Sequence, residues 1–339
     1  MDLQTLKTTA SSMVANGKGI LAIDESHGTC KKRFDALGVD CTEETRRAYR
    51  GLLVSAPGIS EFVSGMILFD ETIRQKDNYG KTYSEVLSAA GMIPGIKVDT
   101  GAHDLALHRH EKVTEGLDGL RDRLEEYALL GARFAKWRAV ITIGENIPSE
   151  ACYKANAHAL ARYAALCQEQ SIVPMVEPEI LMDGNHSIER CYEVTAKTLQ
   201  VLFAELKEQG VAPEGTILKV SKVLPGKDHE AERDPKKVAE LTVKCLTENV
   251  PHELAGIVFL SGGQTPQDAS LHLSLMNQIG PHPWPLSFSY GRAIQEPALR
   301  AWAEDQSDWG RAQRALVSRA KMNSLASKGE YTLEMEQNV

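Results

Sequence analysis

Short apolar runs and longer amphipathic segments alternate along the 339-residue chain. The runs are rich in β-branched and other apolar residues, and their shortness is typical of buried strands. In chain order they occupy residues 19–23, 65–69, 95–98, 134–137, 172–176, 216–220, 256–260 and 286–289. The pattern therefore predicts eight strands.

The segments between these runs carry apolar residues three or four positions apart, which is the spacing of one face of an α-helix. Gly131 follows one such series as a helix-ending residue, and the series consists of Leu117, Leu120, Leu124 and Ala128. A second helix is predicted over residues 187–209 with Gly210 at its end, and its apolar face contains Cys191, Val194, Leu199 and Leu202.

Strands that alternate with helices predict a parallel sheet, because each helical crossover returns the chain to the same end of the sheet. Eight such units fit a single closed (β/α)8 barrel, the TIM barrel of the α/β class. The alternative is a doubly wound open sheet, but no GxGxxG motif follows the first run. Length alone allows two domains. Since no flexible linker interrupts the pattern, we predict one domain over residues 1–339, with a short tail from about residue 327.

Charge and composition narrow the classes of function. Lysine and arginine total 38, aspartate and glutamate total 46, and the formal net charge is −8. Such a chain lacks the broad positive field that draws proteins to nucleic acid, although a local anion site is compatible with it. Hydrophobic residues at 42% and charged residues at 25% are typical of a globular protein, so intrinsic disorder and a fibrous class are excluded.

Nothing in the sequence directs the chain to a membrane. Residues 1–13 lack the apolar core of a signal peptide, and no stretch approaches the ~18 to 20 apolar residues of a membrane span. The six cysteines form no CxxC pair, so we interpret them as reduced and structural. We expect a cytoplasmic protein that binds neither nucleic acid nor membrane.

Ionisable residues gather at the ends of the predicted strands. All strands of a parallel barrel end at one rim, so residues that are distant in sequence converge there. Alternation along extended chain places two basic residues on one side of the fourth strand and two carboxylates on one side of the fifth. The predicted rim cluster consists of Asp24, Lys97, Lys136, Arg138, Glu177, Glu179 and Lys219.

This cluster has two interpretations. The first is a structural network of ion pairs, in which the lysines offset the cost of burying carboxylates. The second is catalysis: a lysine among other cations and apolar walls has a lowered pKa, and its free amine attacks a ketone to form an iminium. Nearby carboxylates then carry the protons. That chemistry needs no metal or cofactor, and the histidines show no metal-ligand spacing.

Two glycine-containing turns follow the last two runs and predict a phosphate site. They read Ser261-Gly262-Gly263-Gln264 and Ser289-Tyr290-Gly291-Arg292. Glycine lets backbone N–H groups approach an anion, and the loops after strands 7 and 8 are the usual phosphate site of this barrel. A plain turn is the alternative for the first of them. Lys32 and Arg33 are basic residues that could hold a second phosphate; the alternative is that they lie on a solvated helix face.

Six segments together resemble class I fructose-1,6-bisphosphate aldolase, and the resemblance extends from Gly17 to about Tyr331. It implies a (β/α)8 Schiff-base lyase of glycolysis and gluconeogenesis that forms a homo-oligomer, commonly a tetramer. It also implies that a net acidic chain holds a concentrated basic pocket for a small sugar bisphosphate. The segments are Gly19-Ile20-Leu21-Ala22-Ile23-Asp24-Glu25-Ser26, Gly95-Ile96-Lys97-Val98-Asp99, Phe134-Ala135-Lys136-Trp137-Arg138, Val176-Glu177-Pro178-Glu179-Ile180-Leu181, Leu260-Ser261-Gly262-Gly263-Gln264 and Phe288-Ser289-Tyr290-Gly291-Arg292-Ala293.

The resemblance assigns roles to individual residues. It implies that Lys219 is the Schiff-base lysine and that Asp24 is the base at the C4 hydroxyl. Glu177 resembles the main general acid/base, assisted by Glu179 and Lys136. On the substrate and C1-phosphate side it implies Lys97, Arg138, Ser261, Gly262, Ser289, Gly291 and Arg292. On the C6-phosphate side it implies Ser26, Thr29, Lys32 and Arg33.

Two features depart from the family pattern. Where the family typically reads Lys-Pro-Asn-Met, this chain reads Lys219-Val220-Ser221-Lys222, and the added lysine either lowers the pKa of Lys219 further or points to solvent. Eukaryotic members end in a mobile tail with a terminal tyrosine, whereas this chain ends Glu336-Gln337-Asn338-Val339. We therefore expect altered proton exchange and a weaker preference for the bisphosphate over fructose 1-phosphate.

Three alternatives remain at this point. Two are Schiff-base lyases that prefer fructose 1-phosphate or sedoheptulose 1,7-bisphosphate, the latter including transaldolase-like chemistry. The third is a scaffold without catalytic activity. The charged cluster argues against a scaffold, because a scaffold has no use for buried charges that cost stability.

Overall fold

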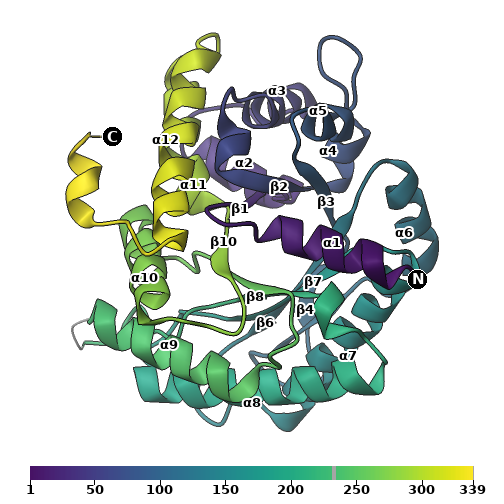
Figure 1. The fold of residues 1–339 in the computed structure, drawn as a ribbon, viewed down its shortest axis with the longest axis vertical. Coiled ribbons are helices and arrows are strands. Elements are labelled where there is room, and N and C mark those ends of the chain that lie inside the picture. Colours follow the sequence, from purple (N-terminus) through teal and green to yellow (C-terminus); the bar gives the residue numbers. More distant parts are fainter. Residues whose placement is uncertain (231–233, 339) are drawn as a thin grey trace.

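Eight parallel strands close into a barrel in the computed structural model, which describes residues 1–230 and 234–338 (Figure 1). The barrel closes where β1 pairs with β10, with Ile20 opposite Ser289 and Leu21 opposite Tyr290. Around the barrel the strands follow the order β1-β10-β9-β8-β7-β6-β3-β2. Their bounds are β1 (Gly19–Ala22), β2 (Val63–Leu68), β3 (Ile93–Lys97), β6 (Phe134–Ile141), β7 (Val173–Ile180), β8 (Ile217–Val220), β9 (Gly256–Phe259) and β10 (Leu286–Tyr290).

Each of the eight predicted apolar runs overlaps one of these strands, so the prediction of a closed (β/α)8 barrel is confirmed. The open-sheet alternative is wrong, because an open sheet has two unpaired edge strands and here every barrel strand has two partners. The strands are buried along almost their whole length, as expected when helices cover the outside of a parallel barrel.

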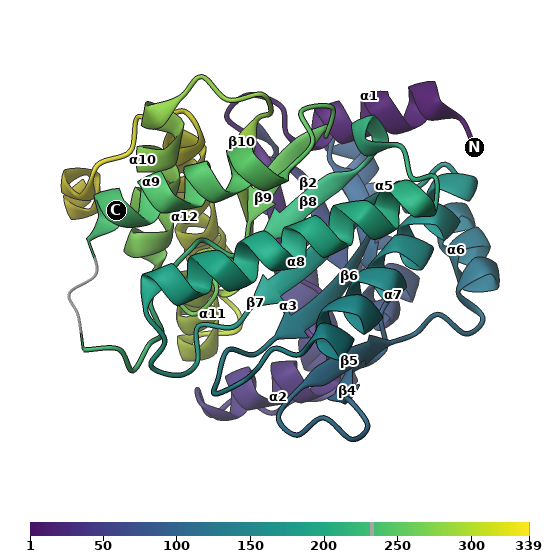
Figure 2. The ribbon, with the colours of Figure 1, turned by 90° about the horizontal axis from the view of Figure 1, so that it is seen from below.

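Helices surround the barrel (Figure 2). The two predicted helices are confirmed as α6 and α8, and each is followed by a glycine with positive φ, Gly131 at 99° and Gly210 at 71°. The α-helices are α1 (Leu3–Met13), α2 (His27–Asp35), α3 (Glu43–Val54), α4 (Asp70–Arg74), α5 (Tyr83–Ala89), α6 (Leu120–Leu129), α7 (Glu150–Glu169), α8 (Ile188–Glu208), α9 (Pro235–Asn249), α10 (Pro266–Ile279), α11 (Arg292–Glu304) and α12 (Trp309–Ser327). Short 3-10 helices are η1 (Ile59–Glu61), η2 (Pro213–Gly215) and η3 (Leu333–Asn338).

The structure adds a hairpin that the apolar pattern did not predict. Strands β4 (Gly101–Asp104) and β5 (Lys112–Glu115) pair antiparallel beside the barrel (Figure 2). Only one residue of the two strands, Thr114, is buried. A hairpin that buries so little carries no apolar alternation, which is why sequence pattern could not reveal it.

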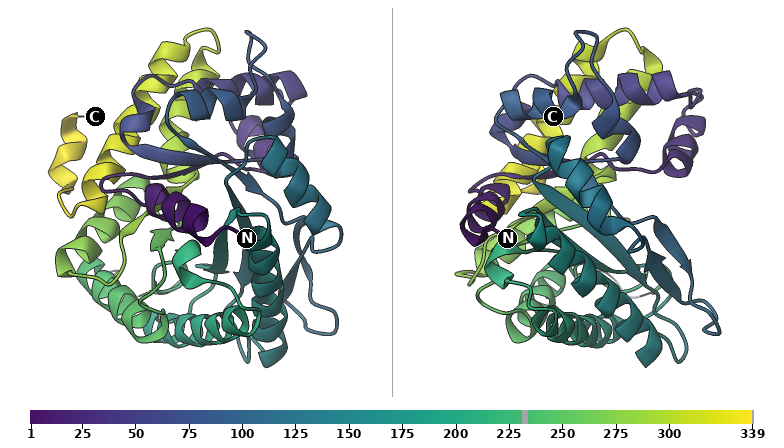
Figure 3. Two further views of the ribbon diagram at one scale, coloured as in Figure 1. Left: turned by 45° about the vertical axis from the view of Figure 1, so that its right-hand side comes forward. Right: turned by 90° about the vertical axis from the view of Figure 1, so that its right-hand side faces the viewer.

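Helix α1 covers the amino-terminal end of the barrel (Figures 1 and 3). Its Leu6, Ala10 and Met13 are fully buried in one apolar cluster with first residues of barrel strands such as Phe134 and Val173. A second, larger apolar cluster fills the layer between the barrel and the helices. With one end closed by packing, the carboxyl ends of the strands are the open end of the barrel.

The six cysteines are free thiols, and all except Cys41 are buried. In residues 1–230 and 234–338, no helix has both the length and the apolar character required of a membrane span.

Candidate active site

An open cavity of about 1110 Å³ lies at the carboxyl ends of the barrel strands. The structure brings almost every sequence-predicted site residue to its wall, although these residues come from the ends of seven different strands. The predicted residues that line it are Asp24, Ser26, Thr29, Arg33, Lys97, Lys136, Arg138, Glu177, Glu179, Lys219, Ser261, Gly262, Ser289, Gly291 and Arg292. Lys32 is exposed on α2 and does not line the cavity.

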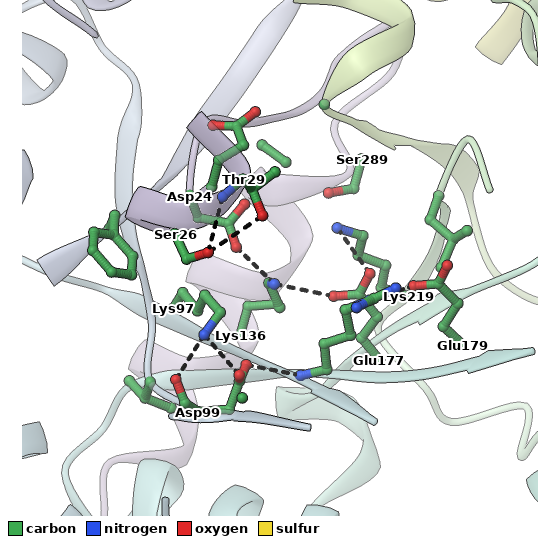
Figure 4. Close-up of a pocket in the computed structure, with 18 of the residues that line it drawn as sticks. Asp24, Ser26, Thr29, Lys97, Asp99, Lys136, Glu177, Glu179, Lys219 and Ser289 are labelled. Carbon is green, nitrogen blue, oxygen red and sulfur yellow. Dashed lines mark hydrogen bonds and ion pairs between the residues drawn. The ribbon is translucent and has the colours of Figure 1, made fainter. Parts of the chain in front are cut away.

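Four of these side chains form a continuous chain of ion pairs at the centre of the cavity (Figure 4). Lys136 Nζ lies 2.6 Å from Asp24 Oδ2 and 3.3 Å from Glu177 Oε2. Glu177 Oε1 in turn lies 3.2 Å from Lys219 Nζ. Glu177 thus contacts both lysines, one with each oxygen, and a proton can pass between Lys219 and Glu177 directly.

Burial and neighbouring charges shift the pKa values of these ion-paired side chains in opposite directions, and the effect of the charges is larger. Burial by itself raises the pKa of Asp24, but the attraction of Lys136 and Lys219 outweighs it and lowers that pKa to about 2. The pKa of Glu177 is likewise lowered, because Lys219, Lys136 and Arg138 overcome the effect of burial. The pKa of Lys136 is raised by Asp24 and Glu177 despite burial. Asp24 and Lys136 therefore keep their charges at neutral pH.

A second group of ion pairs forms one side of the cavity. Lys97 Nζ lies 2.7 Å from Asp99 Oδ1 and also donates to the Asp99 carbonyl oxygen. The other oxygen of the Asp99 carboxylate accepts from the backbone N–H of Arg138 at 3.1 Å. Arg138 Nε lies 2.5 Å from Glu179 Oε2. Asp99 therefore holds the ends of β3 and β6 together and fixes where Lys97 points.

The turns after β9 and β10 have the features of an anion site. Gly262 and Gly263 have φ of 54° and 83°, a left-handed conformation that glycine adopts without strain. Ser289 Oγ is buried without a hydrogen-bond partner in the described residues, and Ser289 lines the cavity. Gly291 caps α11, whose amino end favours a negative charge. A phosphate oxygen would give the Ser289 hydroxyl the partner it lacks.

Another part of the cavity wall is formed by α2 and the residues that precede it. Ser26 caps this helix, and its hydroxyl accepts from the backbone N–H of Thr29 at 3.4 Å. Arg33 is oriented by Glu25, whose Oε1 lies 2.5 Å from Arg33 Nη1. Glu25 also pairs with the buried Arg50 at 3.0 Å. Of the two basic residues predicted for a second phosphate, only Arg33 lines the cavity, while Lys32 faces away from it on the same helix.

The cavity also contains residues that sequence reasoning missed. Asp99 and Glu25 lie in the resembling segments but were not selected, and a signal was present, because each is within two residues of a selected charge. Arg74 and Arg123 reach the cavity from helices, and the sequence carries no sign of that. Altogether eight basic and seven acidic side chains line the cavity, so the expectation of a concentrated basic pocket is wrong. The charges nearly balance, because each lysine at the rim is paired with a carboxylate.

In the part of the chain that the structure describes, no three His, Cys, Asp or Glu side chains come close enough together to hold a metal ion. The central chain of pairs instead combines an amine with an adjacent carboxylate. This arrangement can form an imine with a carbonyl compound and move protons to and from it.

Comparisons with known proteins identify the family of this chain. The family model described as fructose-bisphosphate aldolase class-I matches residues 5–339. A protein of Xanthomonas axonopodis pv. citri named "Probable fructose-bisphosphate aldolase class 1" is 59% identical over 98% of this chain and 99% of its own. The Arabidopsis thaliana protein "Fructose-bisphosphate aldolase 4, cytosolic" is 49% identical over 93% of this chain and 80% of its own.

A solved structure extends the similarity to three dimensions. It is that of fructose-bisphosphate aldolase from Plasmodium falciparum in complex with TRAP and a small-molecule inhibitor. The TM-score is 0.95 at 46% sequence identity, over 97% of this chain and 95% of the other. The fold, the function and the enzyme class predicted from the sequence are confirmed. This chain belongs to the family of class-I fructose-bisphosphate aldolases, which are aldehyde-lyases.

Proposed function

We propose that the chain cleaves fructose 1,6-bisphosphate reversibly to dihydroxyacetone phosphate and glyceraldehyde 3-phosphate, with Lys219 as the Schiff-base residue. The observation that carries this proposal is the chain of ion pairs from Asp24 through Lys136 and Glu177 to Lys219. A structural network alone would not need to open onto a cavity with anion-binding turns at two sides. Function in glycolysis and gluconeogenesis follows from this reaction.

The first half of the reaction uses Lys219 and Glu177. Lys219 passes a proton to Glu177, 3.2 Å away, and the free amine attacks the C2 carbonyl carbon of the substrate. Glu177 then returns the proton to the C2 hydroxyl of the carbinolamine, and water leaves as the iminium forms. Lys136 stays charged throughout, since its pKa is raised by its two carboxylate partners, and it holds Glu177 in place. Glu179 assists through Arg138, which it orients.

The second half breaks the C3–C4 bond. Asp24 removes the proton of the C4 hydroxyl, the C4–O carbonyl forms, and the electrons of the C3–C4 bond move into the iminium. Glyceraldehyde 3-phosphate leaves, and an enamine remains on Lys219. Protonation at C3 and hydrolysis of the resulting iminium release dihydroxyacetone phosphate. Because charge moves inside a cavity of fixed, paired side chains, little reorganisation accompanies each step.

The two phosphates bind two separate sets of residues in this proposal. The C1 phosphate binds the turns after β9 and β10, where Ser261, Gly262, Ser289, Gly291 and Arg292 lie. The C6 phosphate binds beside α2, near Ser26, Thr29 and Arg33. Lys97 and Arg138 contact the sugar between them. Lys32 contributes only long-range attraction from the exposed side of α2.

We further propose that residues 1–339 form one domain in a cytoplasmic homo-oligomer, commonly a tetramer in this family. A partly buried interaction supports the single domain: Glu336 Oε1, in the tail, accepts from Tyr331 Oη at 2.7 Å and pairs with Arg319 at 2.5 Å. The name of the Arabidopsis relative supports the location. Sedimentation velocity and cell fractionation test these two statements.

Borohydride reduction tests the mechanism. In the presence of dihydroxyacetone phosphate, reduction is expected to attach the triose covalently to the peptide that contains Lys219, as read by mass spectrometry. A Lys219→Met variant should show no adduct. Loss of cleavage activity on addition of EDTA, or an adduct on a different lysine, would refute the proposal. Parallel assays with fructose 1-phosphate and sedoheptulose 1,7-bisphosphate measure which substrate the enzyme prefers.

A further inference from the structure

A second buried lysine lies three residues after Lys219. Lys222 is 1% exposed, so of the two alternatives that the sequence left open for it, the one in which it points to solvent is wrong. Its Nζ donates to Tyr290 Oη at 3.1 Å and lies 5.1 Å and 5.5 Å from the ring centres of Tyr290 and Phe259. Unlike Lys219, it does not line the substrate cavity. Lys222 is therefore enclosed between β8, β9 and β10, on the outer side of the barrel wall.

This position is directly behind the two phosphate turns. Lys222 lines a small internal cavity together with Leu260 and Gly262, and both of these residues also line the substrate cavity. Residues of the first turn therefore lie between the small cavity that Lys222 lines and the substrate cavity. At the second turn, Tyr290, which contacts the amine, is the neighbour of Ser289, and alternation along β10 directs their side chains to opposite sides.

The titratable groups around Lys222 come from three further elements. Asp268 of α10 supplies an attracting negative charge, but not enough to offset burial, and the pKa of Lys222 is lowered to about 7. Tyr290 stays neutral, because burial raises its pKa. Cys191 of α8 stays a thiol for the same reason, and burial lowers the pKa of His186, which precedes α8. Lys222 therefore changes its charge near pH 7.

We propose that Lys222 is a buried switchable charge for the C1-phosphate site: it takes up a proton from solvent when the phosphate binds, and its ammonium then strengthens phosphate binding through the thin wall of the two turns. The inference rests on the proposed function for the location of that phosphate. A dianion beside a poorly solvated amine stabilises the protonated form, since charges interact strongly where water is excluded. By linkage, protonation must then strengthen binding by the same factor.

The consequence is a bisphosphate affinity that depends on pH around neutrality. Among the described residues, the lining of the substrate cavity contains no histidine, so a change in affinity near pH 7 has no obvious alternative source on the enzyme. Methionine, which the family typically has at this position, matches lysine in length and carries no charge. Lys222→Met is therefore the matched test variant.

The test uses hexitol 1,6-bisphosphate, the reduced form of the substrate, which lacks a ketone and cannot form an imine. Binding is measured by calorimetry from pH 6 to 9, in pairs of buffers with different ionisation enthalpies, which gives both affinity and protons taken up. The ligand's own protonation is the same for every variant, so differences between variants report the enzyme. Lys227→Met serves as control, because Lys227 lies on the same segment but is 52% exposed.

The expected result is that wild-type enzyme binds the hexitol about fivefold more tightly than Lys222→Met at pH 6, and equally tightly at pH 9. Near pH 7.4 wild type should take up about 0.4 proton more than Lys222→Met. Lys227→Met should follow the wild type. Equal affinities and equal proton uptake across the range would overturn the proposal, as would a difference that does not change with pH.

A second variant keeps the test valid if Lys222→Met does not fold. Tyr290→Phe removes the hydrogen-bond acceptor of Lys222 but keeps the ring, so the pH of maximal proton uptake should move downward. Unchanged uptake would contradict the proposal. Failure of the borohydride test with intact pH-dependent hexitol binding would refute the Schiff-base mechanism and leave this inference standing, whereas the reverse result would refute this inference alone.

Discussion

Lys219 and Lys222 are three residues apart and both buried, but their surroundings differ. Lys219 faces Glu177 and an open cavity, whereas Lys222 faces two aromatic rings and a phenol oxygen. A carboxylate neighbour both stabilises an ammonium and accepts its proton, while an aromatic enclosure does only a little of the first and none of the second. Burial alone therefore does not make a lysine catalytic. A catalytic lysine also needs an adjacent proton acceptor and access for the substrate.

Replacing Lys219 by methionine should have the largest effect on cleavage activity, because of the two lysines only Lys219 faces the substrate cavity. We expect cleavage of fructose 1,6-bisphosphate to fall by about 10⁴-fold or more, because Lys222 is walled off and Lys136 is held charged by two carboxylates. The measurement is the rate of triose phosphate release, with Lys227→Met as the control. Residual activity above one tenth of wild type would mean that another amine can form the imine.

Removing the proton acceptor should have the next largest effect. Glu177→Gln is expected to lower kcat by roughly 10³-fold, since a neutral amide can neither accept the proton of Lys219 nor return one to the carbinolamine. The rate of borohydride trapping should fall in parallel, because imine formation itself is slowed. A normal trapping rate with slow cleavage would instead assign Glu177 to a later step.

Replacing Lys222 by methionine should raise the stability of the folded protein, whereas replacing Lys219 removes its activity. The pKa of Lys222 is about 7 in the folded state and 10.5 for an ordinary lysine, so between these values the unfolded chain binds more protons and stability rises with pH. Methionine carries no such cost. The variant should therefore be more stable than wild type by an amount on the order of 4 to 5 kcal/mol at pH 7 and below, and this advantage should disappear towards pH 10.

Urea unfolding at several pH values measures that difference. Lys227→Met is again the control, and its stability relative to wild type should change little over the same range. A Lys222→Met protein that is less stable than wild type at pH 6 would show that the ammonium is well compensated in its enclosure, contrary to this account.

The smallest effect is expected at Ser289, where the contact forms only with substrate. Ser289→Ala should raise KM for fructose 1,6-bisphosphate about tenfold, the contribution of one hydrogen bond to a charged group. Stability should be unchanged, because the Ser289 hydroxyl has no partner among the described residues. Loss of stability without a change in KM would indicate a structural hydroxyl.

Much of the fold could be read from the chain because barrel strands are buried on both faces. Most positions of every run are apolar, as in residues 256–260, and a helix between two runs is marked by its own spacing and in some cases by an ending glycine such as Gly210. The hairpin of β4 and β5 could not be predicted, since it buries almost nothing and so places no demand on residue type. Helix α1 was not predicted either, because its apolar residues pack against barrel residues that are distant in sequence.

The site was predicted where a charge interrupts or ends a strand, as at Lys136, Glu177 and Lys219. It was not predicted where a side chain reaches the cavity from a helix, as Arg74 and Arg123 do. Neighbours in sequence also separated: Arg33 turns towards Glu25 and the cavity, while Lys32 turns to solvent. Successive residues of a helix point about 100° apart, so the direction of each side chain depends on how α2 packs against the barrel.

The eight strands, the parallel barrel and the charges at its rim could be predicted from the residues alone, because the period of apolar residues and the ends of strands are local properties. The pairing of the charges and the enclosure of Lys222 are visible only in the folded structure. Such pairings depend on distances between chain segments that are far apart in sequence. A lysine's environment, and therefore its chemistry, is fixed only when β8, β9 and β10 come together.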